Sequence, residues 1–301
     1  MILQAVLALL EKEVSFKKRI TNIHSTNGDQ NEPWFMRMNP NGTVPVLKDG
    51  DKIVCESDDI IDYIDRHYHS GFTLVPDKFS DAGKEVARLR DVFNNVQYEI
   101  ITFGVIRNPE LSVTGPKIPV SPAAMKKRIE MMLTSQTAYI KSMSERHPDL
   151  RDSYRAKLEA KTSRIQKTTD VDQIREAMKK CKVVFDDVEQ LLGNLKKKYG
   201  IPDVWLVGPR FTAADVTFTI LLHRLELLGL ESRYFPQDKR PHIHDYYQRL
   251  LERKSLQEVL KEEKRIMVIM MSTMLKRKLP YVAAVVAIGV AIGAAFFTMK
   301  H

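Results

Sequence analysis

The chain has 301 residues, with 47 lysines and arginines against 38 aspartates and glutamates, which gives a formal net charge of +9. This length corresponds to about two domains, and a hydrophobic content of 44% is enough to form their cores. The two cysteines are too few for a disulfide framework or a structural zinc site, whereas the positive charge suits nucleic acid or an anionic membrane as a partner.

The first seventy residues carry the pattern of an α/β segment. Apolar residues recur at helical spacing from Ile2 to Leu10, and residues 14–23 alternate as the residues of a β-strand do. A hairpin is predicted next, in which residues 44–47 lead into an Asp49-Gly50 turn and Lys52–Cys55 forms the returning strand.

A helix is predicted directly after the hairpin. Ser57 has the side chain of an N-cap, and Asp58 and Asp59 would lie at the positive end of the helix dipole. An apolar stripe from Ile60 to Tyr68 gives this helix a face to bury.

From about residue 80 onward the pattern is helical. Four prolines between residues 109 and 122 indicate a loop region after the first long helix. Charged helices are predicted over 126–150 and 152–165. Residues 141–198 hold 15 lysines and arginines against 10 acidic residues, by count on the sequence. Much of the positive charge therefore lies in and directly after a charged helical insertion at about residues 110–180.

Residues 171–199 carry apolar residues at alternating three- and four-residue intervals over four heptads. Two interpretations fit this pattern, a core helix of an α-bundle and a helix that pairs with a second one. We favour the core helix, because Cys181 and Tyr199 are poor residues for a coiled-coil seam.

A capping box begins the following helix. Thr212 and Asp215 are three residues apart and can bond reciprocally to each other's backbone N–H groups, and Phe211 can pack on Val216. His223 interrupts the apolar run of this helix, and we interpret it as a hydrogen-bonded core histidine rather than a catalytic one.

An uncharged apolar run from Tyr281 to Met299 is long enough for a transmembrane helix, and we place the span at 279–299. Its flanks are basic, with Lys276, Arg277 and Lys278 before it and Lys300 after it. The positive-inside rule predicts that residues 1–265 face the cytosol, with 266–278 as a juxtamembrane segment. The apolar run at 281–299 is short, alanine-rich and free of leucine, which favours the mitochondrial outer membrane over the endoplasmic reticulum.

Several of these motifs together resemble the glutathione transferase superfamily: the Asn39–Pro45 loop, the Asp-Gly hairpin, Glu56-Ser57 and the Thr212/Asp215 capping box. The resemblance implies an α+β protein with a thioredoxin-like domain over 1–70 and an all-α domain over 80–265. It also implies that Pro45 is a cis-proline, that Val44 offers backbone hydrogen bonds to the cysteinyl part of glutathione, and that Glu56 and Ser57 bind its γ-glutamyl end.

The chain is more specifically similar to the ganglioside-induced differentiation-associated protein 1 family. The similarity rests on segments along nearly the whole chain: 31–37, 108–111, 147–150, 223–229, 239–247, the charged insertion and the basic-flanked tail. It implies a mitochondrial outer-membrane protein that faces the cytosol, affects mitochondrial network shape and fission, and forms a homodimer. Fission or trafficking proteins of the cytosol would then be its further partners.

The chain departs from the transferase pattern at its start. Transferases place a Tyr, Ser or Cys after the first strand to stabilise the glutathione thiolate, and here Met1 already lies in what matches the first helix. The first strand is therefore expected to be missing, in a chain that is either incomplete at its N-terminus or rearranged. We name no catalytic residue and no metal ligand.

Ser15 and Cys55 are the residues that we considered as substitutes for the absent nucleophile, and neither has a histidine nearby in sequence. We expect Cys55 to be buried rather than reactive; an exposed Cys55 would instead suit a regulatory intermolecular disulfide.

The sequence thus predicts a non-enzymatic adaptor that requires no cofactor, with glutathione as an optional ligand. The alternative is an active glutathione transferase at the membrane surface. Nucleic-acid binding is disfavoured, since no recognition motif or interleaved aromatic pattern accompanies the basic residues.

Overall fold

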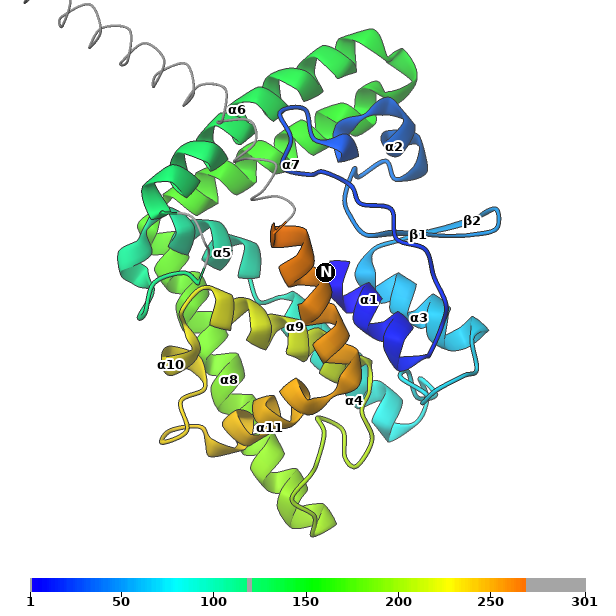
Figure 1. The fold of residues 1–301 in the computed structure, drawn as a ribbon, viewed down its shortest axis with the longest axis vertical. Coiled ribbons are helices and arrows are strands. Elements are labelled where there is room, and N and C mark those ends of the chain that lie inside the picture. The colour runs from blue at the N-terminus through cyan, green and yellow to red at the C-terminus, as the bar shows by residue number, and fades with distance from the viewer. Residues whose placement is uncertain (1, 118–120, 269–301) are drawn as a thin grey trace, which may run out of the picture. The chain divides into compact units, whose positions relative to one another are not determined.

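The structure is a computed structural model, and it describes residues 2–117 and 121–268. The chain divides into two compact units, Met1–Glu252 and Arg253–His301. Residues 254–268, in the second unit, are helical. The elements of the first unit, drawn in Figure 1, are α1 (Ile2–Glu11), η1 (Asp29–Asn31), α2 (Pro33–Met38), β1 (Val46–Asp49), β2 (Lys52–Cys55), α3 (Ser57–His67), α4 (Asp81–Asn94), α5 (Tyr98–Arg107), η2 (Pro109–Leu111), α6 (Pro122–Arg146), η3 (Pro148–Leu150), α7 (Arg151–Thr169), α8 (Val171–Tyr199), α9 (Ala213–Leu227), α10 (Glu231–Tyr234) and α11 (Pro241–Glu252).

The predicted hairpin is present, with its turn one residue later than expected. β1 and β2 pair antiparallel from Val46 opposite Cys55 to Asp49 opposite Lys52, so that Gly50 and Asp51 form the two-residue turn. Gly50 has a φ of 56°, which a glycine adopts without steric cost.

The strand predicted over 14–23 is wrong. These residues form no strand, and in the described part of the chain β1 and β2 pair only with each other. A strand needs a neighbouring strand to form hydrogen bonds with its backbone groups. Without one, the alternating apolar side chains of this segment become only partly buried. Val14 and Phe16 pack against the α1–α3 core around Leu9 and Ile60.

The predicted N-cap of α3 is also wrong by one position. Ser57 is the first helical residue, and Glu56 occupies the cap with a φ of 62°. Asp58 and Asp59 lie in the first turn as predicted, and Ile60 is buried, as are the next residues of the apolar stripe.

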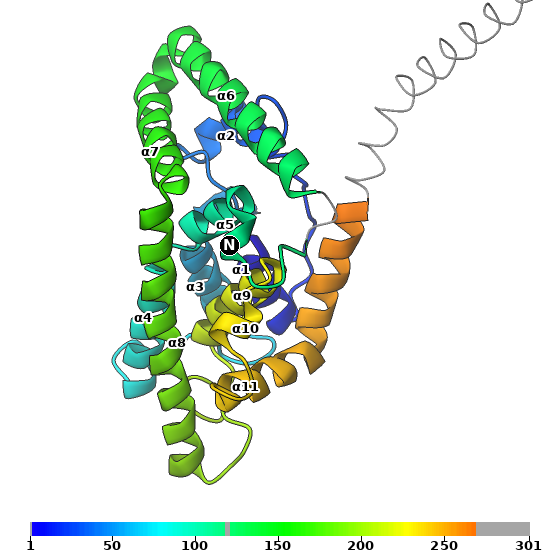
Figure 2. The ribbon, with the colours of Figure 1, turned by 90° about the vertical axis from the view of Figure 1, so that its left-hand side faces the viewer.

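The helical part is arranged around α8. Ile174, Met178, Cys181 and Phe185 are all buried on one face of this helix, which packs against α5 and α11. The core-helix interpretation of the heptad pattern is therefore confirmed. The charged helices α6 and α7 lie side by side as an antiparallel pair (Figures 1 and 2).

The capping box is confirmed. Asp215 accepts hydrogen bonds from the Thr212 N–H and from the Thr212 hydroxyl, both at 2.8 Å. Its other oxygen accepts from the Leu206 N–H at 2.9 Å and from the Tyr246 hydroxyl at 2.7 Å. The buried carboxylate thus joins the start of α9 to α11. His223 is buried, as expected of a core histidine.

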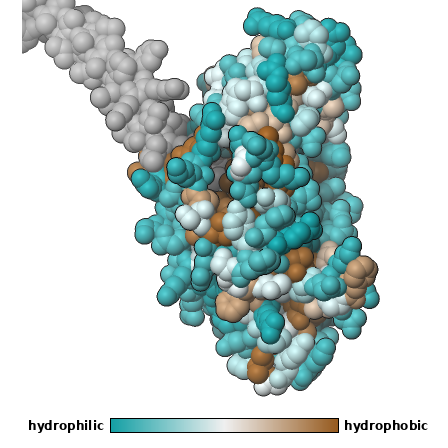
Figure 3. All heavy atoms as spheres, turned by 90° about the vertical axis from the view of Figure 1, so that its right-hand side faces the viewer, coloured by the Kyte–Doolittle hydropathy of each residue, from teal (hydrophilic) through white to brown (hydrophobic). Residues whose placement is uncertain are grey.

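The face of the molecule in Figure 3 is mostly hydrophilic, with hydrophobic residues scattered between hydrophilic ones. Within residues 2–117 and 121–268, none of the helices combines the length and the apolar character needed to span a bilayer. The predicted anchor at 279–299 and its flanking residues Lys276, Arg277, Lys278 and Lys300 lie outside the described residues.

Candidate functional site

The hairpin register brings the four residues predicted for glutathione together. Because Val46 pairs with Cys55, the Val44-Pro45 dipeptide and the Glu56-Ser57 dipeptide flank the same end of the hairpin. The Val44-Pro45 peptide bond is cis, as the transferase resemblance implied. In the described part of the chain the backbone N–H and C=O of Val44 make no hydrogen bond, so both groups are available to a ligand.

The loop before the cis-proline is held by its own side chains. The Asn39 amide donates to the Thr43 carbonyl at 2.8 Å and to the Thr43 hydroxyl at 3.0 Å, and its carbonyl oxygen accepts from the Asn41 N–H at 3.1 Å. Gly42 completes the turn with a φ of 58°. These bonds fix the backbone that leads into Val44.

Glu56 and Ser57 differ in exposure. Glu56 is exposed, and its Oε1 accepts from the Thr43 hydroxyl at 3.1 Å and from the Asn41 amide at 3.4 Å. Ser57 is only 9% exposed. The Glu56 carboxylate therefore holds the loop against the hairpin. The backbone of Glu56 has a positive φ, which a non-glycine residue adopts at an energetic cost.

A lysine that sequence reasoning missed supports the loop from the helical part. Lys157 on α7 donates to the Gly42 carbonyl and, at 3.3 Å, to the Gln30 carbonyl. Burial, with the charges of Lys161 and Arg164, lowers the pKa of Lys157 to about 7. The spacing of these three basic residues on one helix face was visible in the sequence, but the loop that they approach was not.

Neither residue considered as a substitute nucleophile is activated. Ser15 is exposed in an irregular segment. Cys55 is half-buried, and burial, followed by the charges of Glu56 and Asp59, raises the pKa of its thiol. A thiol needs a lowered pKa to react as a thiolate near neutral pH. Across the residues that the structure covers, no cluster of three His, Cys, Asp or Glu side chains could hold a metal ion.

Two protein-family models match the chain. The glutathione S-transferase N-terminal domain matches residues 3–67, and the glutathione S-transferase C-terminal domain matches residues 142–254. The first match contains the cis-proline loop and α3, and the second contains the capping box.

Curated relatives extend the similarity along most of the chain. Mouse ganglioside-induced differentiation-associated protein 1-like 1 is 29% identical over 262 residues, which cover 86% of this chain and 70% of the relative. Glutathione S-transferase TCHQD of Arabidopsis thaliana is 25% identical over 256 residues, which cover 84% of this chain and 83% of the relative.

Solved structures of low sequence identity share the fold. The β-etherase LigF from Sphingobium sp. strain SYK-6 aligns with a TM-score of 0.59 at 19% identity, covering 86% of this chain and 94% of the other. Glutathione transferase F7 from Populus trichocarpa aligns with a TM-score of 0.56 at 17% identity, covering 86% and 92%. The thioredoxin-like N-terminal part and the all-helical C-terminal part are thus those of a glutathione-transferase-like fold.

Proposed function

Because the chain belongs to the ganglioside-induced differentiation-associated protein 1 family of glutathione-transferase-like proteins, we propose that it is a non-enzymatic adaptor that regulates mitochondrial network shape and fission. The non-enzymatic part of this proposal rests on the absence of an activated nucleophile among the described residues near the cis-proline loop. The cis-proline loop is retained, while Ser15 is exposed on an irregular segment and the pKa of the Cys55 thiol is raised. The glutathione-type loop thus serves as part of a scaffold rather than as a thiol-activating centre.

The proposal places the adaptor on the mitochondrial outer membrane through its C-terminal sequence. Residues 281–299 contain no charged side chain and follow the basic Lys276, Arg277 and Lys278. In the proposed topology residues 1–265 face the cytosol. There the charged helices α6 and α7 are accessible to cytosolic fission or trafficking proteins, and a second copy of the chain forms a homodimer with the first.

The alternative function is that of an active glutathione transferase, and one feature favours it. The unpaired backbone groups of Val44 beside the cis-peptide bond suit the peptide backbone of a glutathione-like ligand. Glutathione bound there without turnover is compatible with the adaptor, whereas turnover is not.

Two measurements on the full chain test the proposal. In cells that lack the protein, we expect the full chain to change mitochondrial length and branching, and a variant without residues 279–301 to have no such effect. The purified full chain is expected to show no conjugation of glutathione to a generic electrophile. Robust turnover, or morphology restored equally by the truncated variant, would overturn the proposal.

A further inference from the structure

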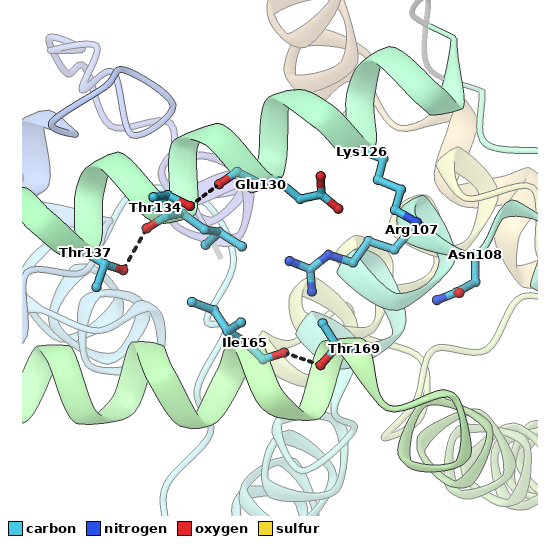
Figure 4. A pocket seen from close by; sticks show the side chains of 9 residues that line it. Arg107, Asn108, Lys126, Glu130, Thr134, Thr137, Ile165 and Thr169 are labelled. Carbon is cyan, nitrogen blue, oxygen red and sulfur yellow. Dashed lines mark hydrogen bonds between the residues drawn. The ribbon is translucent and has the colours of Figure 1, made fainter.

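A cavity of about 560 Å³ lies away from the cis-proline loop, where the end of α5, the first half of α6 and the end of α7 meet. Figure 4 shows this cavity with the Arg107 guanidinium pointing into the space between α6 and α7. Nothing in the proposed adaptor function uses this cavity. Its lining nevertheless combines a buried charge with two further charged groups, three threonines and two aliphatic side chains.

Arg107 is the buried charge. Only 8% of the residue is exposed, and Nη1 donates to the Thr168 hydroxyl at 2.8 Å. Within the described residues its Nε has no hydrogen-bond partner, and no carboxylate lies within ion-pair distance of its guanidinium. Burial lowers the pKa of Arg107, although a guanidinium stays charged near neutral pH. The charge of Glu130 acts on Arg107 only from beyond ion-pair distance and offsets part of the cost of burial, so an anion bound in the cavity would lower that cost further.

The other charged groups of the lining set the charge of the ligand. Figure 4 shows Lys126 on α6 beside Arg107, with Glu130 one turn further along the helix. Two positive groups and one negative group leave a single positive charge. This balance suits a singly charged carboxylate, whereas a phosphate dianion would meet repulsion from Glu130.

The remaining lining offers few hydrogen-bond donors. The hydroxyls of Thr134, Thr137 and Thr169 donate to backbone carbonyls of their own helices, as the dashed lines in Figure 4 indicate. Leu133 and Ile165 add aliphatic wall. The donors left for a ligand are therefore at the Arg107 and Lys126 end, and the body of the ligand would lie against methyl and methylene groups.

We propose that this cavity binds a small organic acid, with its carboxylate on Arg107 and Lys126 and its apolar body against Leu133 and Ile165. A carboxylate matches the planar fork of a guanidinium, and the desolvated setting strengthens the ion pair. The site is separate from the predicted glutathione residues, so it can be occupied whether or not glutathione binds.

Calorimetry on the full chain tests the proposal with three probes: benzoate, the neutral isostere benzamide, and inorganic phosphate. We expect benzoate to bind at least about tenfold more tightly than either of the others, because only benzoate combines a single negative charge with an apolar body. In the native chain, benzoate should also shift the methyl signals of Thr134, Thr137 and Thr169 in NMR spectra. Equal binding of benzamide, equal binding of phosphate, or no binding of benzoate would each overturn the proposal.

Four variants locate the carboxylate. Arg107→Met keeps much of the aliphatic stem and should weaken benzoate binding about tenfold or more, while Lys126→Gln should weaken it about threefold. Glu130→Gln removes the competing carboxylate and should tighten binding about twofold to threefold. Lys127→Gln removes an exposed charge that does not line the cavity, and is the matched control.

The opposite effects expected of Lys126→Gln and Glu130→Gln keep the proposal testable if Arg107→Met does not fold. Both residues are exposed on α6, so neither change disturbs the core. Unchanged benzoate affinity in a folded Arg107→Met chain, or in both α6 variants, would contradict the assigned site.

Discussion

Lys157 links the stability of the molecule to pH. An unperturbed lysine has a pKa of 10.5, and burial beside Lys161 and Arg164 lowers the pKa of Lys157 to about 7 in the folded chain. Between about pH 7 and pH 10.5 the unfolded chain therefore binds a proton that the folded chain lacks. Under that condition the free energy of unfolding increases with pH, and below about pH 7 this contribution levels off at its minimum.

We therefore predict that the urea midpoint of the full chain rises between pH 6.5 and pH 9, and that Lys157→Met reduces this rise. Part of the rise should remain, because burial also lowers the pKa of Lys161, to about 8. Lys167→Met, an exposed change on the same helix, is the control and should retain the whole rise. An undiminished pH dependence in Lys157→Met would contradict the link between Lys157 and folding.

Individual residues were predictable where their chemistry is local. The reciprocal bonds of Thr212 and Asp215 span three residues, whereas the cis bond at Pro45 was implied by the resemblance to glutathione transferases. Lys157 and Arg107 were missed, because their partners lie about 115 and 61 positions away in the sequence. No local pattern distinguishes a lysine that meets a loop carbonyl from one that meets water.

The contact between α5 and α8 depends on a residue without a side chain. A Cβ built on Gly104 would lie 2.6–2.8 Å from three side-chain atoms of Ile174, which is itself fully buried. The two helices could not approach this closely if residue 104 had a side chain. Overpacking of this kind typically costs about 1–3 kcal/mol.

We predict that Gly104→Ala lowers the free energy of unfolding by about 1–3 kcal/mol, measured by urea denaturation. Gly193→Ala on α8 is the matched control. Its Cβ would meet only the tip of the half-buried His242 ring at 3.0 Å, and alanine is the better helix former by about 1 kcal/mol. Ile174→Val should restore part of the loss in the Gly104→Ala chain, since it removes one of the clashing atoms. Equal effects of the two glycine changes would contradict this account of the helix contact.

The elements also differ in how far the sequence specifies them. The heptad pattern of α8 predicted a core helix because a helix satisfies its own backbone, so burial of one stripe is enough. Residues 14–23 had an equally regular pattern and formed no strand, because a strand depends on a neighbour that the described chain does not provide. Periodicity therefore predicted both the helix and its buried face in α8, whereas in residues 14–23 only Val14 and Phe16 of the predicted inward face are partly buried.

At the scale of the whole molecule, the net charge of +9 is divided between two regions. One comprises the charged helices up to the end of α8, and the other is the basic cluster before residues 281–299. In α7 and α8 most charged side chains lie on exposed faces, where they contribute little to the core. The cluster at Lys276, Arg277 and Lys278 lies outside the described residues, and in the proposed function it directs membrane insertion.

We predict that the combined change of Lys276, Arg277 and Lys278 to Ser moves a fluorescent fusion of the full chain from mitochondria to reticular membranes. The reason is electrostatic: in the proposed topology the basic flank would hold the cytosolic end of the span at the anionic surface, at about 1 kcal/mol for each charge near that surface. Changing Lys127, Lys179 and Lys180 to Ser removes the same charge from exposed helix positions, and this control should remain on mitochondria. A protease added to intact organelles should digest residues 1–265 of the native chain, as a cytosolic domain requires. Mislocalisation of both triple variants would show that total charge, rather than the flank of the span, selects the membrane.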